Sequence, residues 1–201
     1  VPKYVNGPET VLFKKRQSLY ALDLAREGAF RGGAVVAVEG YMDVIALHQA
    51  GFTGAVAPLG TALTAEQMEE LWRLTPEPIL CFDGDAAGAR AAARAAEAAL
   101  PLISAERSLK LATLPPGEDP DTLVVKGGKA AFQAVLDGAR GLGDALFGLI
   151  AEGRPVATPE QRAALLTRLD TAANAVADRA LAGEYRRLLR DRFYQATRPA
   201  P

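Results

Sequence analysis

The chain has 201 residues, of which 49% are hydrophobic and 23% are charged, a composition typical of an ordinary globular protein. A single Cys and a single His exclude a disulfide framework and a Cys/His zinc cluster within these residues, and no apolar run reaches the length of a membrane span. The net charge of −1 hides a segregation, because residues 39–123 carry 13 acidic and 5 basic side chains while the segments before and after them are net basic.

The opening residues, 1–31, begin with the loop-like stretch VPKYVNGPET. They are basic and begin at Val1 rather than Met, so we interpret them as a lead-in segment from a preceding subdomain of a longer protein. From residue 34 onward, short apolar runs alternate with helical patterns. In chain order, the predicted elements are a strand at 34–38, a helix at 41–50, a strand at 54–58, a helix capped by Thr64 and Gln67 and stopped by Pro76, a strand at 78–82, a helix at 86–100 and a strand at 109–114.

Strands that alternate with helices in this way indicate βαβ crossovers, and therefore a mainly parallel sheet with helices on both faces. From about residue 120 the pattern becomes helical throughout, and Thr158 and Gln161 form a capping box for a further helix. The predicted fold class is α/β, followed by a C-terminal helical subdomain. We expect the lead-in segment at 1–31, the α/β domain at 32–123 and the helical subdomain at 124–201.

Acidic side chains follow three of the predicted strands. Glu39 ends the first, Asp83 and Asp85 follow the third, Glu118, Asp119 and Asp121 follow the fourth, and Asp43 lies in the first turn of the helix after Glu39. Ligands of an open parallel sheet bind outside the carboxyl ends of its strands, so we expect these acids to cluster. Oxygen ligands without His or Cys select a hard cation, Mg²⁺ or Mn²⁺, and two such ions would suit in-line phosphoryl chemistry.

Each acid also has a purely structural interpretation. Asp83 or Asp85 is a suitable N-cap for the next helix, Asp119 with Pro120 behind it fits a cap as well as a ligand, and Asp43 favours the helix dipole. Gly84, between two aspartates, predicts room for a ligand to approach the backbone. His48, Cys81 and Trp72 are expected to be ordinary helix, strand and core residues.

Several motifs together resemble one family. The stretches VVAVEGYMDVIALHQAGF, APLGTALT, ILCFDGDAAGARAA and LPPGEDPDTLV are similar to the Toprim domain of bacterial replicative primases of the DnaG type, and PKYVNGPETVLFKK is similar to the basic segment before it. The resemblance runs from residue 2 to about 137. Glu-Gly with Asp-x-Asp is common to Toprim proteins, whereas the EGYMDVIAL and PKYVNGPET motifs are narrower and indicate the primase.

The resemblance implies a set of site residues. Glu39, Asp83 and Asp85 match the family's catalytic, metal-binding acids, and Asp43, Asp119 and Asp121 match further acids of the same site. Lys3, Asn6, Lys15, Tyr41, Gly60 and Thr61 match positions at which the family contacts nucleotide phosphates or DNA. One to three Mg²⁺ or Mn²⁺ ions are expected, and zinc only in a module that these residues do not contain.

The resemblance also implies an activity, namely synthesis of short RNA primers on a single-stranded DNA template from NTPs by nucleotidyl transfer. It implies a replicative helicase as partner, through a C-terminal domain outside these residues, a bacterial cytoplasmic location and no membrane. We expect the isolated chain to be incomplete and weakly active. Two alternatives stay open, a nuclease or topoisomerase-type Toprim module, and a non-catalytic module that binds metal or nucleotide.

Overall fold

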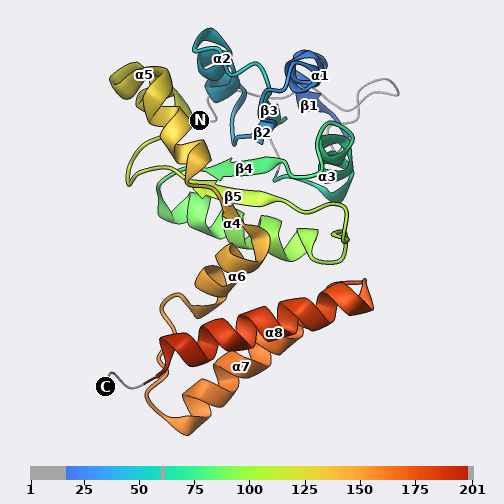
Figure 1. The fold of residues 1–201 in the computed structure, drawn as a ribbon. Helices are drawn as coiled ribbons and strands as arrows, with labels where there is room; N and C mark the ends of the chain where they lie inside the picture. The colour runs from blue at the N-terminus through green and yellow to red at the C-terminus, as the bar shows by residue number, and fades with distance from the viewer. Residues whose placement is uncertain (1–16, 60–61, 199–201) are drawn as a thin grey trace.

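Six short strands form one mixed sheet in the computed structural model, which describes residues 17–59 and 62–198 (Figure 1). The strands are β1 (Leu19–Tyr20), β2 (Val36–Ala37), β3 (Ala55–Pro58), β4 (Ile79–Phe82), β5 (Lys110–Thr113) and β6 (Arg140–Gly141). They are ordered β1-β3-β2-β4-β5-β6, with the four central strands parallel and the two edge strands antiparallel to their neighbours. The predicted α/β class with a mainly parallel sheet is confirmed.

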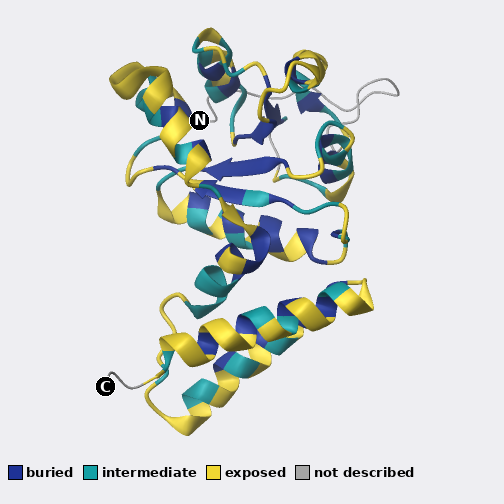
Figure 2. Ribbon diagram, viewed as in Figure 1, coloured by how far each residue is buried: buried dark blue, intermediate teal, exposed yellow. Residues whose placement is uncertain are grey.

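Helices cover both faces of this sheet. They are α1 (Leu22–Phe30), α2 (Tyr41–Gln49), α3 (Ala65–Trp72), α4 (Ala86–Ala99), α5 (Pro120–Asp137), α6 (Leu142–Ala151), α7 (Pro159–Asn174) and α8 (Arg179–Ala196). Residues of α2 and α5 share one buried cluster with one face of the strands, and residues of α1, α3, α4 and α6 share a second cluster with the other face. Figure 2 shows the strands buried between these two layers.

The predicted helix starts are confirmed in detail. Thr64 accepts a hydrogen bond from the backbone N–H of Gln67 at 3.2 Å, and Gln67 Oε1 accepts one from the N–H of Thr64 at 3.0 Å. Thr158 and Gln161 form the second capping box at the start of α7. Gln67 is fully buried and also donates from Nε2 to the carbonyl of Ser18 at 2.8 Å, which fixes the chain just before β1 against α3.

The sequence did not predict β1, α1 or β6. Strands β1 and β6 have only two residues each. Strands this short form only because they pair with another strand that is distant in the sequence. Helix α1 lies in the lead-in segment and contains Gly28, a poor helix former. A Cβ at Gly28 would lie 2.8 Å from Thr53 Oγ1, so the glycine lets α1 approach the chain before β3.

Helix α5 continues through the expected boundary between residues 123 and 124. It packs against α2 and β5, and Phe132 and Leu136 are buried in the core of that face. Beyond α6, helices α7 and α8 pack against each other as an antiparallel pair that extends away from the sheet in Figure 1. Helix α6 contacts both helices and connects them to the sheet. No helix in residues 17–59 or 62–198 combines the length and apolar character needed to cross a membrane.

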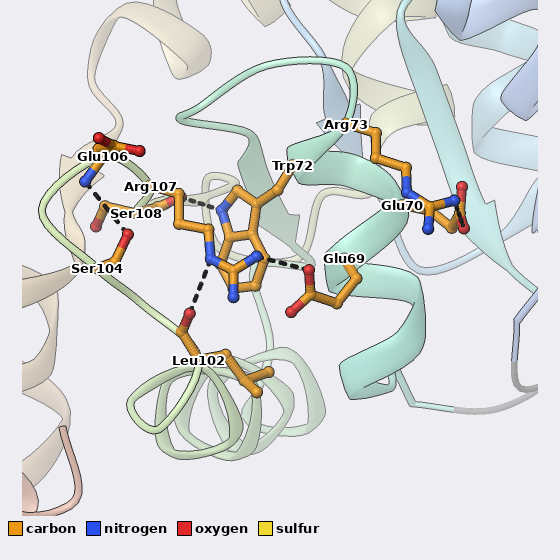
Figure 3. Close-up of polar contacts among 9 residues, drawn as sticks. All are labelled: Glu69, Glu70, Trp72, Arg73, Leu102, Ser104, Glu106, Arg107 and Ser108. Atoms are coloured by element: carbon orange, nitrogen blue, oxygen red, sulfur yellow. Dashed lines mark hydrogen bonds and ion pairs between the residues drawn. The ribbon is translucent and has the colours of Figure 1, made fainter. Parts of the chain in front are cut away.

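Trp72 joins α3 to the segment before β5, at the amino end of that strand (Figure 3). Its Nε1 donates a hydrogen bond to the carbonyl of Ser108 at 2.6 Å, and the Arg107 guanidinium lies 4.7 Å from the centre of its ring. Arg107 also donates to Glu69 Oε2 at 2.6 Å and to the carbonyl of Leu102 at 3.0 Å. Trp72 is thus a partly buried structural residue, as expected.

Candidate metal centre

The carboxyl ends of two neighbouring parallel strands bring two acids together. In the register of β2 and β4, Ala37 lies opposite Leu80. Glu39 follows β2 by two positions and Asp83 follows β4 directly. The backbone N–H of Asp83 donates a hydrogen bond to Oε1 of Glu39 at 3.2 Å. The Glu39 carboxylate is therefore held beside the end of β4, as the strand-end argument predicts.

Asp83 has the most perturbed carboxyl group of this cluster. Its Oδ1 is buried and has no hydrogen-bond partner among the described residues. Burial raises the pKa of Asp83, and the nearby charges of Glu39, Asp43, Asp119 and Asp85 act in the same direction, so that together they bring it to about 7. A buried oxygen without a donor, surrounded by like charges, costs free energy that a bound cation would offset.

Asp43 links α2 to the start of α5. Its Oδ2 accepts a hydrogen bond from the backbone N–H of Gly40 at 3.2 Å. Burial raises the pKa of Asp43, the charges of Asp119 and Asp121 act in the same direction, and backbone N–H groups of Gly40 and Asp121 oppose the shift, with a net pKa of about 6. The structure thus brings Asp43, Asp119 and Asp121 into one electrostatic neighbourhood.

Two of the predicted ligands are helix caps. Asp85 Oδ1 accepts a hydrogen bond from the backbone N–H of Gly88 at 2.7 Å, at the start of α4. Asp119 Oδ1 accepts one from the backbone N–H of Thr122 at 2.7 Å, with Pro120 as the first residue of α5. In both aspartates one carboxylate oxygen satisfies a helix end, and the other has no hydrogen bond to the described residues.

Gly84 does not provide the room for a ligand that the sequence suggested. A Cβ at Gly84 would lie 1.9 Å from the carbonyl oxygen of Pro115. The Gly84 N–H donates to the carbonyl of Glu118 at 3.1 Å, and the N–H of Gly117 donates to the carbonyl of Gly84 at 2.9 Å. The space beside this glycine is therefore filled by the loop after β5, which corrects the earlier interpretation.

Glu118, which the predicted ligand set omitted, lies in the loop between β5 and α5, next to Asp119. Its Oε1 accepts a hydrogen bond from Lys126 Nζ at 2.6 Å, which lowers the pKa of the carboxyl. Its Oε2 is buried without a hydrogen-bond partner in the described part of the chain. The acid-rich GEDPD stretch marks this acid in the sequence. Its pairing with Lys126 depends on the position of α5 relative to the loop after β5, which the sequence does not show.

Of the six predicted nucleotide-binding residues, Tyr41 lies in the described part of the chain. Lys3, Asn6, Lys15, Gly60 and Thr61 lie outside the described residues. Tyr41 is the first residue of α2, next to Glu39-Gly40, and its ring lies 5.8 Å from that of Tyr20. Tyr41 is therefore placed at the same end of the sheet as the acids.

The acids form an open arrangement. Within residues 17–59 and 62–198, no group of three or more His, Cys, Asp and Glu side chains could hold a metal ion by itself. Mg²⁺ typically keeps several waters and takes one or two protein carboxylates together with substrate phosphate oxygens. The observed acids fit a Mg²⁺ site of this kind in three respects. All the donors are oxygens, Glu39 and Asp83 lie side by side with space around them, and no described residue donates a hydrogen bond to Asp83 Oδ1.

The family model described as the Toprim domain matches residues 33–108. The chain is 47% identical over 166 residues to a DNA primase of Escherichia coli K12, covering 83% of this chain and 29% of that protein. It is 39% identical over 195 residues to a DNA primase of Rickettsia bellii, covering 97% of this chain and 33% of that protein.

The fold is similar to that of solved primase domains. A crystal structure of a DNA primase domain from Pseudomonas aeruginosa superimposes with a TM-score of 0.86 at 40% identity, over 100% of this chain and 61% of that one. The chain thus spans about a third of the length of the curated relatives it matches. These matches do not favour the nuclease or topoisomerase alternative.

Proposed function

Because this chain is a Toprim-containing segment of the DnaG-type DNA primase family, we propose that it supplies the metal-binding acids for RNA primer synthesis. One observation carries the proposal. Glu39 and Asp83 meet at adjacent strand ends, and Asp83 presents a buried oxygen to which no described residue donates a hydrogen bond. The reaction would join ribonucleoside triphosphates on a single-stranded DNA template, with pyrophosphate as the leaving group.

In this proposal Glu39 and Asp83 hold the ion, and Asp85 contributes its uncapped oxygen. Mg²⁺ or Mn²⁺, when bound, would stabilise the charge that develops on the attacking and leaving oxygens of the phosphoryl group. Asp43, Asp119 and Asp121 would bind a further ion or shape the field around the first. The raised pKa of Asp83 supports this assignment, because it shows how poorly the cluster tolerates its own charge without a cation.

The substrates and partners belong to the same proposal. Lys3, Asn6, Lys15, Tyr41, Gly60 and Thr61 would contact the triphosphate or the template, since basic and polar groups beside a metal neutralise phosphate charge. A related catalytic domain has been solved bound to single-stranded DNA. We further propose that the activity is cytoplasmic and that a replicative helicase is met through parts of the protein beyond this chain.

Metal binding is the first test. Mn²⁺ loses its free-ion paramagnetic resonance signal when it binds, so titration of the 201-residue chain with Mn²⁺ gives the affinity directly. We expect Glu39→Gln and Asp83→Asn each to weaken binding by roughly tenfold or more. Asp191→Asn, which removes an exposed acid on α8, is the matched control and should bind like the wild type.

Catalysis requires more of the polymerase core than this chain supplies, so activity is tested in a chimera. This chain would replace the corresponding segment of the Escherichia coli primase catalytic core, and primer synthesis from NTPs on single-stranded DNA would be measured. We expect activity that depends on Glu39 and Asp83. Wild-type Mn²⁺ affinity in both variants, or an active chimera that tolerates both substitutions, would refute the proposal.

A further inference from the structure

A hollow of about 550 Å³ lies between α6 and α8, in the helical region beyond the sheet (Figure 1). Arg140 of β6 also lines it, and we call it the α6–α8 hollow. Strand β6 pairs with Lys110 and Leu111, the first two residues of β5, whereas the acids of the proposed metal centre gather at the carboxyl ends of the strands. In the described part of the chain none of those acids lines the hollow, so the proposed function does not use it.

Helical spacing explains how the hollow is built. Residues at positions i, i+3 and i+4 lie on one face of a helix. Each helix contributes three lining residues with this spacing: Asp144, Phe147 and Gly148 from α6, and Arg192, Gln195 and Ala196 from α8. The two helices contact each other, and packed helices normally interdigitate without voids. Because Gly148 and Ala196 are the two smallest residue types, the space between the two faces stays open.

Two guanidinium groups reach the same face of α6. Arg192 donates from Nε and from Nη2 to Oδ1 of Asp144, at 3.1 Å and 2.5 Å. The Nη1 of Arg140 lies 3.6 Å from the position that a Cβ on Gly148 would occupy. Asp144 and Gly148 are four residues apart, which is about 6 Å along the helix axis. The two positive charges therefore lie close to each other beside the hollow.

Both arginines can take part in a further contact. No described residue forms a hydrogen bond or an ion pair with the guanidinium of Arg140. Arg192 leaves its Nη1 unused by Asp144, and both side chains of that ion pair are 46% exposed. Exposed ion pairs are weak, so an anion can share Arg192 at little cost. Paired guanidinium groups are the donors that proteins commonly use to bind phosphate oxygens.

The other lining residues indicate what accompanies the phosphate. Phe147 is half-buried and lines the hollow, and an aromatic ring of this kind offers a surface on which a base can stack. Gln195 is exposed and adds an amide that can donate and accept hydrogen bonds. Basic groups beside an aromatic ring are the combination that binds a single nucleic-acid strand, since the bases of a duplex are already stacked on one another.

We propose that the α6–α8 hollow binds one nucleotide of a single DNA strand, outside the metal centre. Arg140 and Arg192 would contact its phosphate, and Phe147 would stack on its base. Residues 124–201 carry 12 basic and 8 acidic side chains, so the surrounding region attracts a polyanion as well. That this strand is the template of primer synthesis rests on the proposed function, whereas the binding itself does not.

Fluorescence anisotropy of labelled oligothymidylate, titrated with the metal-free 201-residue chain at about 50 mM salt, tests the phosphate contact. Arg140→Ala should weaken binding roughly fivefold and lower the slope of log affinity against log salt by about 1. Arg179→Ala is the matched control. It removes the same charge from an exposed position at the start of α8, outside the hollow, and should change both quantities far less.

Asp144→Asn should have the opposite effect. It removes a negative charge from the hollow and releases Arg192, so DNA should bind roughly threefold more tightly. Asp191→Asn, which removes an exposed acid of α8 outside the lining, should give a smaller gain. A purely structural role for the ion pair between Asp144 and Arg192 predicts no gain, and unchanged circular dichroism would show that each variant is folded.

The base contact is tested separately. Phe147→Leu keeps an apolar side chain but loses the ring, so it should weaken binding of oligothymidylate roughly threefold or more. Binding of an abasic oligonucleotide of the same length should stay at the wild-type level, which also shows that the variant is folded. An equal loss for both oligonucleotides would overturn the stacking contact.

Weaker binding in Arg140→Ala together with tighter binding in Asp144→Asn supports the site. Equal effects of Arg140→Ala and Arg179→Ala would show a general attraction of DNA to positive charge and overturn the proposal. Weaker binding in a folded Asp144→Asn variant, or no binding to the wild type, would overturn it too. Mn²⁺ titration of Glu39→Gln and Asp83→Asn contains no DNA, so failure of the proposed function is distinguishable from failure of this inference.

Discussion

Substitution of Asp83 by Asn should change how the stability of the metal-free protein depends on pH. Burial and the neighbouring acids raise the pKa of Asp83 from 3.8 to about 7 in the folded state. A folded state that holds a proton more tightly than the unfolded chain is most stable below the unfolded pKa. The free energy of unfolding should therefore fall as the pH rises from about 4 to about 7.

The magnitude follows from the size of the shift and the exposure of the group. A shift from 3.8 to about 7 corresponds to about 4 kcal/mol if all of it appeared in folding. Asp83 is only partly buried, so solvent screening reduces the expected loss to about 1–2 kcal/mol. Asp43, whose pKa is raised to about 6, contributes in the same direction, so Asp83→Asn should flatten the profile without abolishing its slope.

Urea unfolding of the metal-free protein at intervals between pH 4 and pH 8 measures this effect. Asp191→Asn is the control, because it removes an exposed acid on α8 outside the cluster. At pH 7.5, Mn²⁺ at 100 times its dissociation constant should restore about 2.7 kcal/mol to the wild type and much less to Asp83→Asn. A variant profile as steep as that of the wild type would show that Asp83 is not strained by its neighbours.

Three other substitutions test the packing around the site by urea unfolding. Gly84→Ala should destabilise the protein by about 2–4 kcal/mol, because its Cβ would lie 1.9 Å from the Pro115 carbonyl oxygen; wild-type stability would contradict the close approach. Gly183→Ala, at an exposed helical position with no atom within 4 Å of its Cβ, should stabilise it by about 1 kcal/mol, and a loss would show that α8 is not a regular helix there. Trp72→Phe loses the hydrogen bond to the Ser108 carbonyl at 2.6 Å and should cost about 1–2 kcal/mol; wild-type stability would show that this bond does not stabilise the fold.

The central strands were predictable because β2, β3 and β4 lie in continuous apolar runs of four or five residues between turn residues, and β5 lies in a mostly apolar run that also contains Lys110 and Thr113. Such runs carry their own signal, since both faces of the strand are buried. The edge strands carry none. β6 consists of Arg140 and Gly141, both exposed, and it becomes a strand only because β5 lies beside it. Its pairing is a property of the assembled sheet rather than of the two residues.

The acids were predictable as a group and not as pairs. Parallel strands end at one edge, so the sequence placed Glu39, Asp83 and Asp119 at the same edge. Which acids meet depends on strand order. β2 lies between β3 and β4, and this places Glu39 directly beside Asp83. A different order of the same strands would have kept every motif and separated these two residues.

The structural and functional interpretations of the aspartates turn out to be compatible. A cap uses one carboxylate oxygen, and in Asp85 that oxygen is held 2.7 Å from the N–H of Gly88. The bond fixes the orientation of the carboxylate and leaves its second oxygen at the carboxyl edge of the sheet. Gly84 stabilises the same turn through the loop after β5. The turn is therefore rigid before any ion arrives, and rigid oxygen ligands lose less entropy on binding a cation than mobile ones.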